Sequence, residues 1–242
     1  MIRVSFSVLF LMFFIGTSFP AQAAIDRCPR QQVKTELFAK RAKTRYQRGD
    51  IFDINSYLGN HSRENGTVLA FVQWGGPDVL SIQPFYKFGM FDAGDGKYCV
   101  MLDRVKVNFY AAPILVMPSN YSRQSCEYKL ILKHEKRHLS ALYNFHDKNT
   151  GKYQAYLGRI ARDVPVSPLI STEAEAEEVR NMIMEYFASN FYEQVHKSIA
   201  EVSAIQQKID SPQEYLGVGK KLERCDVVRN EENNKKTFHK SD

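Results

Sequence analysis

The sequence lacks the motifs and long apolar stretches that mark several large classes of protein. No Gly-x-Ser-x-Gly segment occurs, so the nucleophile turn of an α/β-hydrolase is absent. Gly94-Asp95-Gly96 has the pattern of a tight turn and not of a phosphate-binding loop, and there is no internal repeat or Cys-x-x-Cys redox motif. Beyond residue 19 no apolar run is long enough to cross a bilayer. These absences disfavour a serine hydrolase of that type, a thiol oxidoreductase and an integral membrane protein.

The one long apolar run lies at the N-terminus and has the features of a signal peptide. Met1-Ile2-Arg3 is a short positive segment, residues 4–19 are mostly apolar, and Ala21-Gln22-Ala23 supplies the small residues that signal peptidase favours. Pro20 ends the run before it reaches the length of a membrane anchor. We therefore expect cleavage after residue 23 and a soluble mature protein, periplasmic or secreted, with no membrane-spanning segment.

Four cysteines lie beyond the predicted cleavage site, at positions 28, 99, 126 and 225. An even number in an oxidising compartment predicts two disulfides, for which three pairings exist. Cys28 and Cys225 lie near the two ends, and Cys99 and Cys126 bracket the middle. We favour the pairs Cys28–Cys225 and Cys99–Cys126.

The positive charge of the chain is scattered, with its densest part in residues 34–48. The formal net charge of +6 becomes about +5 when Arg3 leaves with the signal peptide. Residues 29–48 have helical composition, with apolar side chains at i, i+4 spacing such as Val33 and Leu37. A basic helix can bind phosphate or a membrane surface, but a solvated helix face is the commoner explanation.

The remaining pattern predicts strands first and helices second. Residues 67–74, 98–110 and 112–117 are rich in apolar and β-branched side chains, and the second alternates with a one-residue slip. Residues 126–145 are helical, and Thr172-x-x-Glu175 is a capping box that opens a helix to about Lys208. We predict an α+β fold with a small, mostly antiparallel sheet. It forms one domain over 24–228, followed by a disordered tail over 229–242.

The segment His134-Glu135-Lys136-Arg137-His138 matches the H-E-x-x-H motif. Two histidines four residues apart lie on one face of a helix, so both imidazoles can bind one ion. Zinc suits imidazole ligands, and a catalytic zinc keeps one position open for water. Glu135 can accept a proton from that water as the general base. The motif therefore predicts His134 and His138 as zinc ligands and Glu135 as the catalytic residue.

The surroundings of the motif favour a metal site over a chance match. On a helical projection the two histidines lie within an apolar stripe and so point inward, where a polar ring needs a partner. A metal ion would satisfy both rings. The stripe consists of Leu130, Ile131, Ala141, Leu142 and Phe145.

The third ligand is not evident from the motif. His146 lies more than two helical turns beyond His138, too far to share an ion, and His196 lies opposite the apolar face of its helix. Without a suitable histidine, a carboxylate is the default third ligand. The candidates are Glu201, near the apolar face of the long helix, and Asp210 and Glu214, which flank Pro212 just past its end.

The order of several segments resembles a group of exported bacterial proteins described as zinc-dependent proteases of unknown function, with a zincin-like H-E-x-x-H helix. The likeness runs from about Tyr98 to Tyr215, and its specific part is the H-E-x-x-H segment. It comprises Tyr98-Cys99, an alternating strand pair, Cys126, the motif, a long helix and Ile209-Asp-x-x-x-Glu-Tyr215.

The resemblance also bears on the third ligand. Related proteins carry a histidine after the second helix, in a Tyr-Asp…Thr-x-His-Gly segment, and that histidine completes their site. This chain has no histidine there, and Glu214 stands close to its place. We therefore take Glu214 as the first choice for third ligand, with Asp210 as an outer partner or substitute.

Together these features predict an exported zinc metallopeptidase that hydrolyses peptide bonds with a zinc-activated water. Tyr215 or Tyr192 is a candidate for stabilising the oxyanion. We expect a monomer acting on a peptide or protein substrate, including one of the cell envelope, with no nucleic-acid partner.

Two alternatives stay open. The first is a non-catalytic zinc-binding protein, although a purely structural site has no need of Glu135 beside its ligand. The second is a cell-envelope interaction module using residues 34–48; salt-dependent binding to anionic lipid or peptidoglycan, undiminished by a chelator, would favour it.

Overall fold

The structure of the chain, a computed structural model, describes residues 28–58, 69–75 and 78–238. The predicted signal peptide lies outside these residues. The described residues divide into two compact units, where the sequence predicts one domain over 24–228. Unit 1 comprises residues 28–40, 82–109 and 148–198, and unit 2 comprises residues 41–58, 69–75, 78–81, 110–147 and 199–238.

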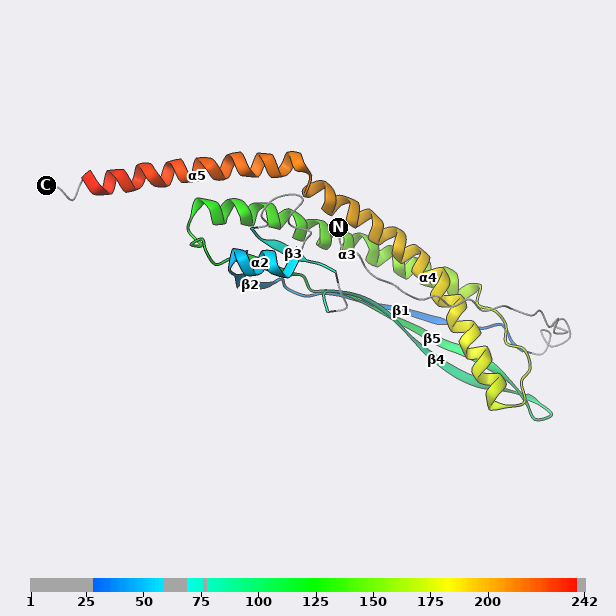
Figure 1. Cartoon of the computed structure of the whole chain (residues 1–242). Helices are drawn as coiled ribbons and strands as arrows, with labels where there is room; N and C mark the ends of the chain where they lie inside the picture. The colour runs from blue at the N-terminus through cyan, green and yellow to red at the C-terminus, as the bar shows by residue number, and fades with distance from the viewer. Residues whose placement is uncertain (1–27, 59–68, 76–77, 239–242) are drawn as a thin grey trace. The chain divides into compact units, whose positions relative to one another are not determined.

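The predicted α+β fold class is confirmed: short sheets come first in the chain and long helices second (Figure 1). No described helix combines the length and apolar character that a bilayer crossing requires. In chain order the elements are β1 (Lys34–Arg41), β2 (Arg45–Gly49), α2 (Ile51–Leu58), β3 (Phe71–Gln73), β4 (Leu80–Gly94), β5 (Lys97–Ala111), β6 (Ile114–Pro118), α3 (Cys126–Arg162), α4 (Glu173–Ile209) and α5 (Pro212–Phe238).

Unit 1 is built on a three-stranded sheet in the order β1-β5-β4. Strands β4 and β5 form a hairpin around Asp95 and Gly96, whose φ angles of 53° and 69° are the left-handed values that a two-residue hairpin loop requires. Asp103 and Arg104 of β5 are both exposed between buried neighbours, so the alternation shifts by one residue, as the sequence predicts. The predicted strand and turn are both confirmed.

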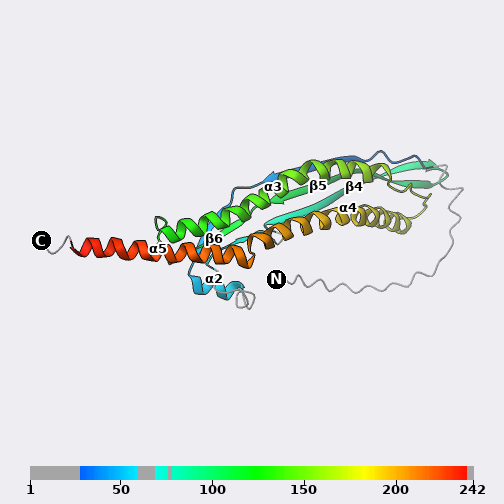
Figure 2. The ribbon, with the colours of Figure 1, turned by 90° about the horizontal axis from the view of Figure 1, so that it is seen from above.

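Helical segments cover one face of this sheet and form the core of unit 1. Residues 148–162 of α3 and 173–198 of α4 lie on the same side of β1, β5 and β4 (Figures 1 and 2). The ring of Tyr153 from α3 lies 5.2 Å from that of Phe109 on β5 and 5.8 Å from that of Phe191 on α4. All three side chains are fully buried. Such aromatic contacts bury large apolar areas and join the two helices to the sheet.

The prediction of a helix over residues 29–48 is wrong, because this segment forms β1 and β2. Side chains of β1 alternate between exposed and half-buried, with Thr35, Leu37 and Ala39 facing inward. That period of two matches a strand, and pairing with β5 engages the backbone groups on one edge of β1. The i, i+4 spacing of Val33 and Leu37 is equally compatible with alternation, since residues four apart also share a strand face. The basic residues therefore lie on strands.

Unit 2 contains a second sheet in the order β2-β6-β3. Strand β6 pairs in parallel with β2 and antiparallel with β3. This sheet is therefore mixed, whereas the sequence predicts a mostly antiparallel one. The N-terminal half of α3 packs on this sheet. The buried core residues are Ala70, Val72, Leu115, Met117, Tyr128, Ile131 and Leu139.

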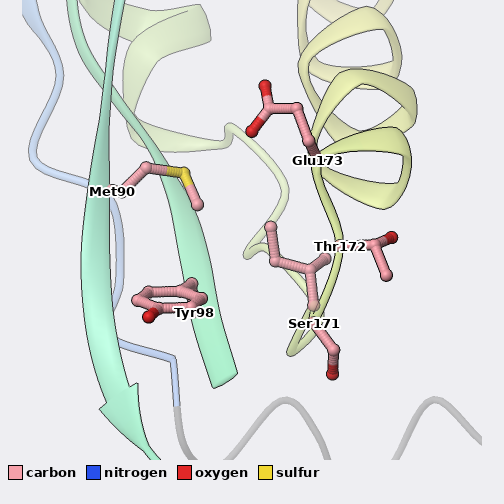
Figure 3. Close-up of a pocket in the computed structure, with 6 residues that line it drawn as sticks. Met90, Tyr98, Ser171, Thr172 and Glu173 are labelled. Carbon is pink, nitrogen blue, oxygen red and sulfur yellow. The ribbon is translucent and has the colours of Figure 1, made fainter. Parts of the chain in front are cut away.

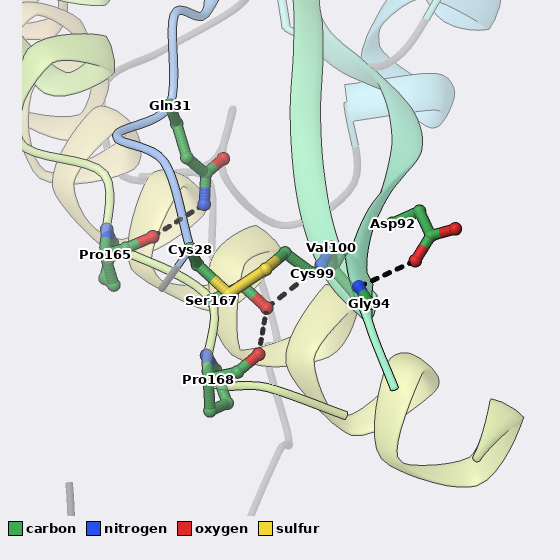
Figure 4. The surroundings of a disulfide bond; sticks show 9 residues. All are labelled: Cys28, Gln31, Asp92, Gly94, Cys99, Val100, Pro165, Ser167 and Pro168. Atoms are coloured by element: carbon green, nitrogen blue, oxygen red, sulfur yellow. Dashed lines mark hydrogen bonds between the residues drawn. A yellow bond between two sulfur atoms is a disulfide. The ribbon is translucent and has the colours of Figure 1, made fainter. Parts of the chain in front are cut away.

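Two disulfides form, as predicted, but the favoured pairing is wrong: the bonds are Cys28–Cys99 and Cys126–Cys225. Each lies within one unit. Cys28 precedes β1, and β1 pairs with β5, which carries Cys99 (Figure 4). Next to this bond, Gln31 accepts a 2.8 Å hydrogen bond from the Leu102 amide and holds the N-terminal segment on β5. Position along the sequence does not predict which segments pair in space.

Helices α3 and α4 begin where the sequence predicts, but α3 extends further, and the sequence did not predict α5. The capping box is confirmed, since Thr172 Oγ1 accepts from the Glu175 amide at 3.2 Å and Glu175 Oε2 accepts from the Thr172 amide at 3.0 Å. Helix α3 continues to Arg162, beyond the predicted end at 145. Pro212 follows the end of α4 and is also the first residue of α5, which includes residues 229–238 of the predicted tail.

Candidate metal centre

Three side chains of unit 2 place one metal-ligand atom each in a small volume. His134 and His138 come from α3, and Asp210 follows the last residue of α4. Asp210 Oδ1 lies 3.3 Å from His134 Nε2 and 3.0 Å from His138 Nε2, and the two Nε2 atoms are 3.3 Å apart. These atoms form a group that could hold a metal ion. The predicted convergence of the two histidines is present.

The group lies at a boundary between protein interior and solvent. His134, His138 and Glu135 are buried, with exposed fractions of 9%, 6% and 5%. The Asp210 side chain is 42% exposed. The two rings meet edge to face with centroids 5.1 Å apart, as expected for residues four apart on a helix. The inward placement that the apolar stripe predicts is thus observed, and Asp210 is the most exposed of the three grouped residues.

The donor set fits a divalent metal ion. Two imidazole nitrogens and a carboxylate oxygen are ligands that zinc and several other transition metals accept. A carboxylate oxygen and two ring nitrogens directed at one another repel unless a cation, either a proton or a metal ion, lies between them. The residues present are therefore compatible with a metal centre.

In the pKa values of Asp210 and His138, the effect of burial opposes the effect of the neighbouring groups. Burial raises the pKa of Asp210, but hydrogen bonds and the charges of His134 and His138 outweigh burial and bring this pKa well below its usual range. Burial lowers the pKa of His138, whereas Asp210, Glu135 and Gln206 raise it, and the net pKa is raised. The site favours a negative carboxylate next to positive charge.

Gln206 contacts His138 and is a site residue that the sequence patterns did not predict. Gln206 is buried on α4, and its Oε1 accepts a hydrogen bond from His138 Nδ1. Its Nε2 donates to the backbone oxygen of His138 at 3.2 Å. One feature of the sequence could have indicated Gln206. It is a polar residue one helical turn before Asp210, on the helix face that carries the apolar residues Val202 and Ile209.

Tyr215 belongs to the site, whereas Tyr192 lies in unit 1. The Tyr215 hydroxyl donates to Asp210 Oδ1 at 3.3 Å, and its ring centroid lies 5.8 Å from that of His134. Burial, followed by the charges of Asp210 and Glu135, raises the pKa of Tyr215. The hydroxyl therefore stays protonated at neutral pH and can donate.

The other candidate carboxylates lie elsewhere. Glu214, the first choice from the sequence, accepts two hydrogen bonds from the Arg137 guanidinium at 2.6 and 3.1 Å. Both partners are nearly half exposed. Glu201 is exposed on α4. The structure thus groups Asp210, the predicted substitute, with the two imidazoles.

A small pocket of about 190 Å³ lies in unit 1 (Figure 3). Its polar backbone groups are engaged, because the Ser171 and Thr172 amides donate to Glu175 and the Tyr98 and Ile170 backbones bond each other. The lining residues are Met90, Tyr98, Ile170, Ser171, Thr172 and Glu173.

Comparison of the chain with models of protein families, with curated proteins and with solved structures finds no match. The resemblance to zincin-like proteases stays a prediction.

Glu135 lies beside the ligand group with an altered acidity. Burial raises its pKa to about 7, although the neighbouring imidazoles of His138 and His134 act in the opposite direction. A carboxyl group with this pKa can accept and release a proton near neutral pH, as a general base requires.

We expect this group to make the stability of the metal-free protein depend on pH. Between pH 4.5 and about 7 the folded chain keeps a proton that the unfolded chain has lost. The free energy of unfolding therefore falls as pH rises through this window, by about 3 kcal/mol from Glu135. The Glu135→Gln variant lacks this contribution. Urea titrations of both metal-free proteins near pH 4.5 and near pH 8 measure the difference; an equal pH dependence of the two would contradict the prediction.

Proposed function

We propose that the protein is a metal-dependent hydrolase, specifically a zinc peptidase, whose ion is held by His134, His138 and Asp210. The observation that carries the proposal is the convergence of their three ligand atoms, within 4.8 Å of one another, beside a buried carboxylate. Three protein ligands leave a fourth tetrahedral position for water, which is typical of catalytic zinc sites. Zinc is favoured because the H-E-x-x-H spacing suits it.

The chemistry follows from the roles of the residues. When bound, zinc supplies Lewis acidity that polarises a scissile carbonyl and lowers the pKa of a water molecule. Glu135 accepts a proton from the attacking water and returns it to the leaving amine. Tyr215 is the candidate donor to the oxyanion, since its hydroxyl faces the same carboxylate oxygen as the two histidines. The proposed substrate is a peptide or protein.

We also propose that this activity is exported, to the periplasm or the medium. The two disulfides are compatible with an oxidising compartment. Export itself rests on the predicted signal peptide over residues 1–23. N-terminal sequencing of the protein recovered from the cell envelope or medium would detect the predicted start at Ala24.

Metal analysis of the purified protein tests the proposal. We expect about one zinc per chain in the wild type and none in the His134→Ala/His138→Ala variant. His196→Ala is the matched control, because His196 is exposed in unit 1 and should leave the metal content unchanged.

Two results would count against the proposal in different ways. No stoichiometric metal after zinc is offered would overturn the metal site. Stoichiometric zinc without hydrolysis of any unfolded protein substrate would favour the non-catalytic zinc-binding alternative.

A further inference from the structure

Two residues one turn apart at the end of α4 contact the two ring nitrogens of His138. Gln206 Oε1 accepts a hydrogen bond from Nδ1, and Asp210 Oδ1 lies 3.0 Å from Nε2. The Asp210 amide donates to the Gln206 backbone oxygen at 3.1 Å, which continues the helical pattern, so the last turn of α4 and the residue after it contact both sides of the ring. Gln206 and His138 are 4% and 6% exposed, so water competes little for this hydrogen bond.

The orientation of the Gln206 amide follows from its second contact. The amide nitrogen lies 3.2 Å from the backbone oxygen of His138. A carbonyl oxygen only accepts, so the NH₂ group must face it, and the amide oxygen must face the ring. An amide oxygen also only accepts, so Nδ1 must carry the hydrogen. The backbone of His138 thereby determines the tautomer of its own side chain through Gln206.

This tautomer leaves the other nitrogen available as a ligand. In a neutral imidazole with hydrogen on Nδ1, Nε2 has a free lone pair. That nitrogen faces Asp210 Oδ1 and lies 3.3 Å from His134 Nε2. The ring is thus held with its ligand atom directed at the candidate metal position.

His134 has no equivalent partner. Its Nδ1 atom is buried and makes no hydrogen bond with any described part of the chain. Among the described residues, the second helix therefore holds the Nδ1 atom of His138 only, and Gln206 is the residue that does so.

We propose that Gln206 is a positioning residue that selects the Nδ1-protonated tautomer of His138 and thereby presents Nε2 to the metal. The metal part of this inference rests on the proposed function, whereas the tautomer part does not. Groups that hold the outer nitrogen of a metal-binding histidine commonly change metal affinity about 10–100-fold when removed.

The test compares Gln206→Met, which keeps side-chain length but has no oxygen acceptor, with Gln206→Glu, which keeps the acceptor. Asp210 Oδ1 also favours a proton on Nε2 in the metal-free chain, so every protein in this comparison carries Asp210→Ala. Nitrogen-15 NMR of these metal-free whole chains, at a pH high enough that the imidazole is neutral, reports the His138 tautomer. We expect the Nδ1-protonated form in the Asp210→Ala background and with Gln206→Glu, and its loss with Gln206→Met. Gln207→Met is the control, because Gln207 is the next residue on α4 and is exposed.

Zinc affinity, measured by competition with a chelator, is the second readout. We expect Gln206→Met to bind zinc about 10–100-fold more weakly than the wild type, and Gln206→Glu to restore binding to within about tenfold. If Gln206 had a purely structural role, Gln206→Met would not change the His138 tautomer. The buried carboxylate of Gln206→Glu would then not restore zinc binding. An unchanged tautomer in Gln206→Met would overturn the inference. If the wild type binds no zinc, the proposed function fails, and the tautomer measurement still decides the role of Gln206.

Discussion

Glu135→Gln is expected to keep the metal ion and to lose hydrolytic activity by about 10²–10⁴-fold, the contribution typical of a general base. Glutamine has the size of glutamate but cannot accept a proton from water at neutral pH. Glu135 is not one of the three grouped ligand atoms, so its replacement leaves the His134, His138 and Asp210 group intact. The substitution also removes a buried ionisable group, so it should not lower the stability of the fold near neutral pH.

The measurement combines zinc content with the rate of cleavage of a fluorescently labelled unfolded protein. Lys136→Gln is the matched control, because Lys136 is the next residue on α3 and its side chain is exposed. The control should keep both zinc and activity. Full hydrolytic activity in the Glu135→Gln variant would refute the role of Glu135 as base.

Asp210→Ala is expected to abolish stoichiometric zinc binding, whereas Glu214→Ala should retain it. Asp210 Oδ1 is the atom that lies beside both imidazole nitrogens. Glu214 instead forms a bidentate ion pair with Arg137. That pair is nearly half exposed, so its removal should leave the free energy of unfolding close to that of the wild type.

Zinc content and chelator competition of the two variants measure this difference. Asp210→Asn serves as a milder substitution, since it keeps the shape of the side chain and removes its charge; it should weaken zinc binding without abolishing the fold. If Glu214→Ala lost the metal and Asp210→Ala kept it, the ligand set chosen from the sequence would replace the one proposed from the structure.

The local part of the site could be predicted because its geometry depends on one helix. Residues four apart on a helix lie on one face, so His134 and His138 had to be neighbours once the segment was helical. The capping box at Thr172 and Glu175 was predictable for the same reason, because both hydrogen bonds close within one helical turn.

The strand assignment shows where local patterns fail. Residues four apart share a face in a strand as well as in a helix, so the spacing of Val33 and Leu37 did not distinguish the two. Residues 34–49 form strands because β1 pairs with β5 and β2 pairs with β6. The partner strands lie far along the chain, so local spacing does not reveal the pairing. The disulfide pairing followed from the same long-range contacts, since Cys28 precedes β1 and Cys99 lies on β5.

The sequence by itself determined the helix that carries His134, Glu135 and His138, its inward face and the presence of two disulfides. Only the tertiary structure decided that Asp210 rather than Glu214 lies beside the imidazoles, and that Gln206 contacts His138. The physical reason is that these residues belong to the end of a second helix. Its rotation and position against α3 depend on packing within unit 2, which no periodicity along either helix specifies.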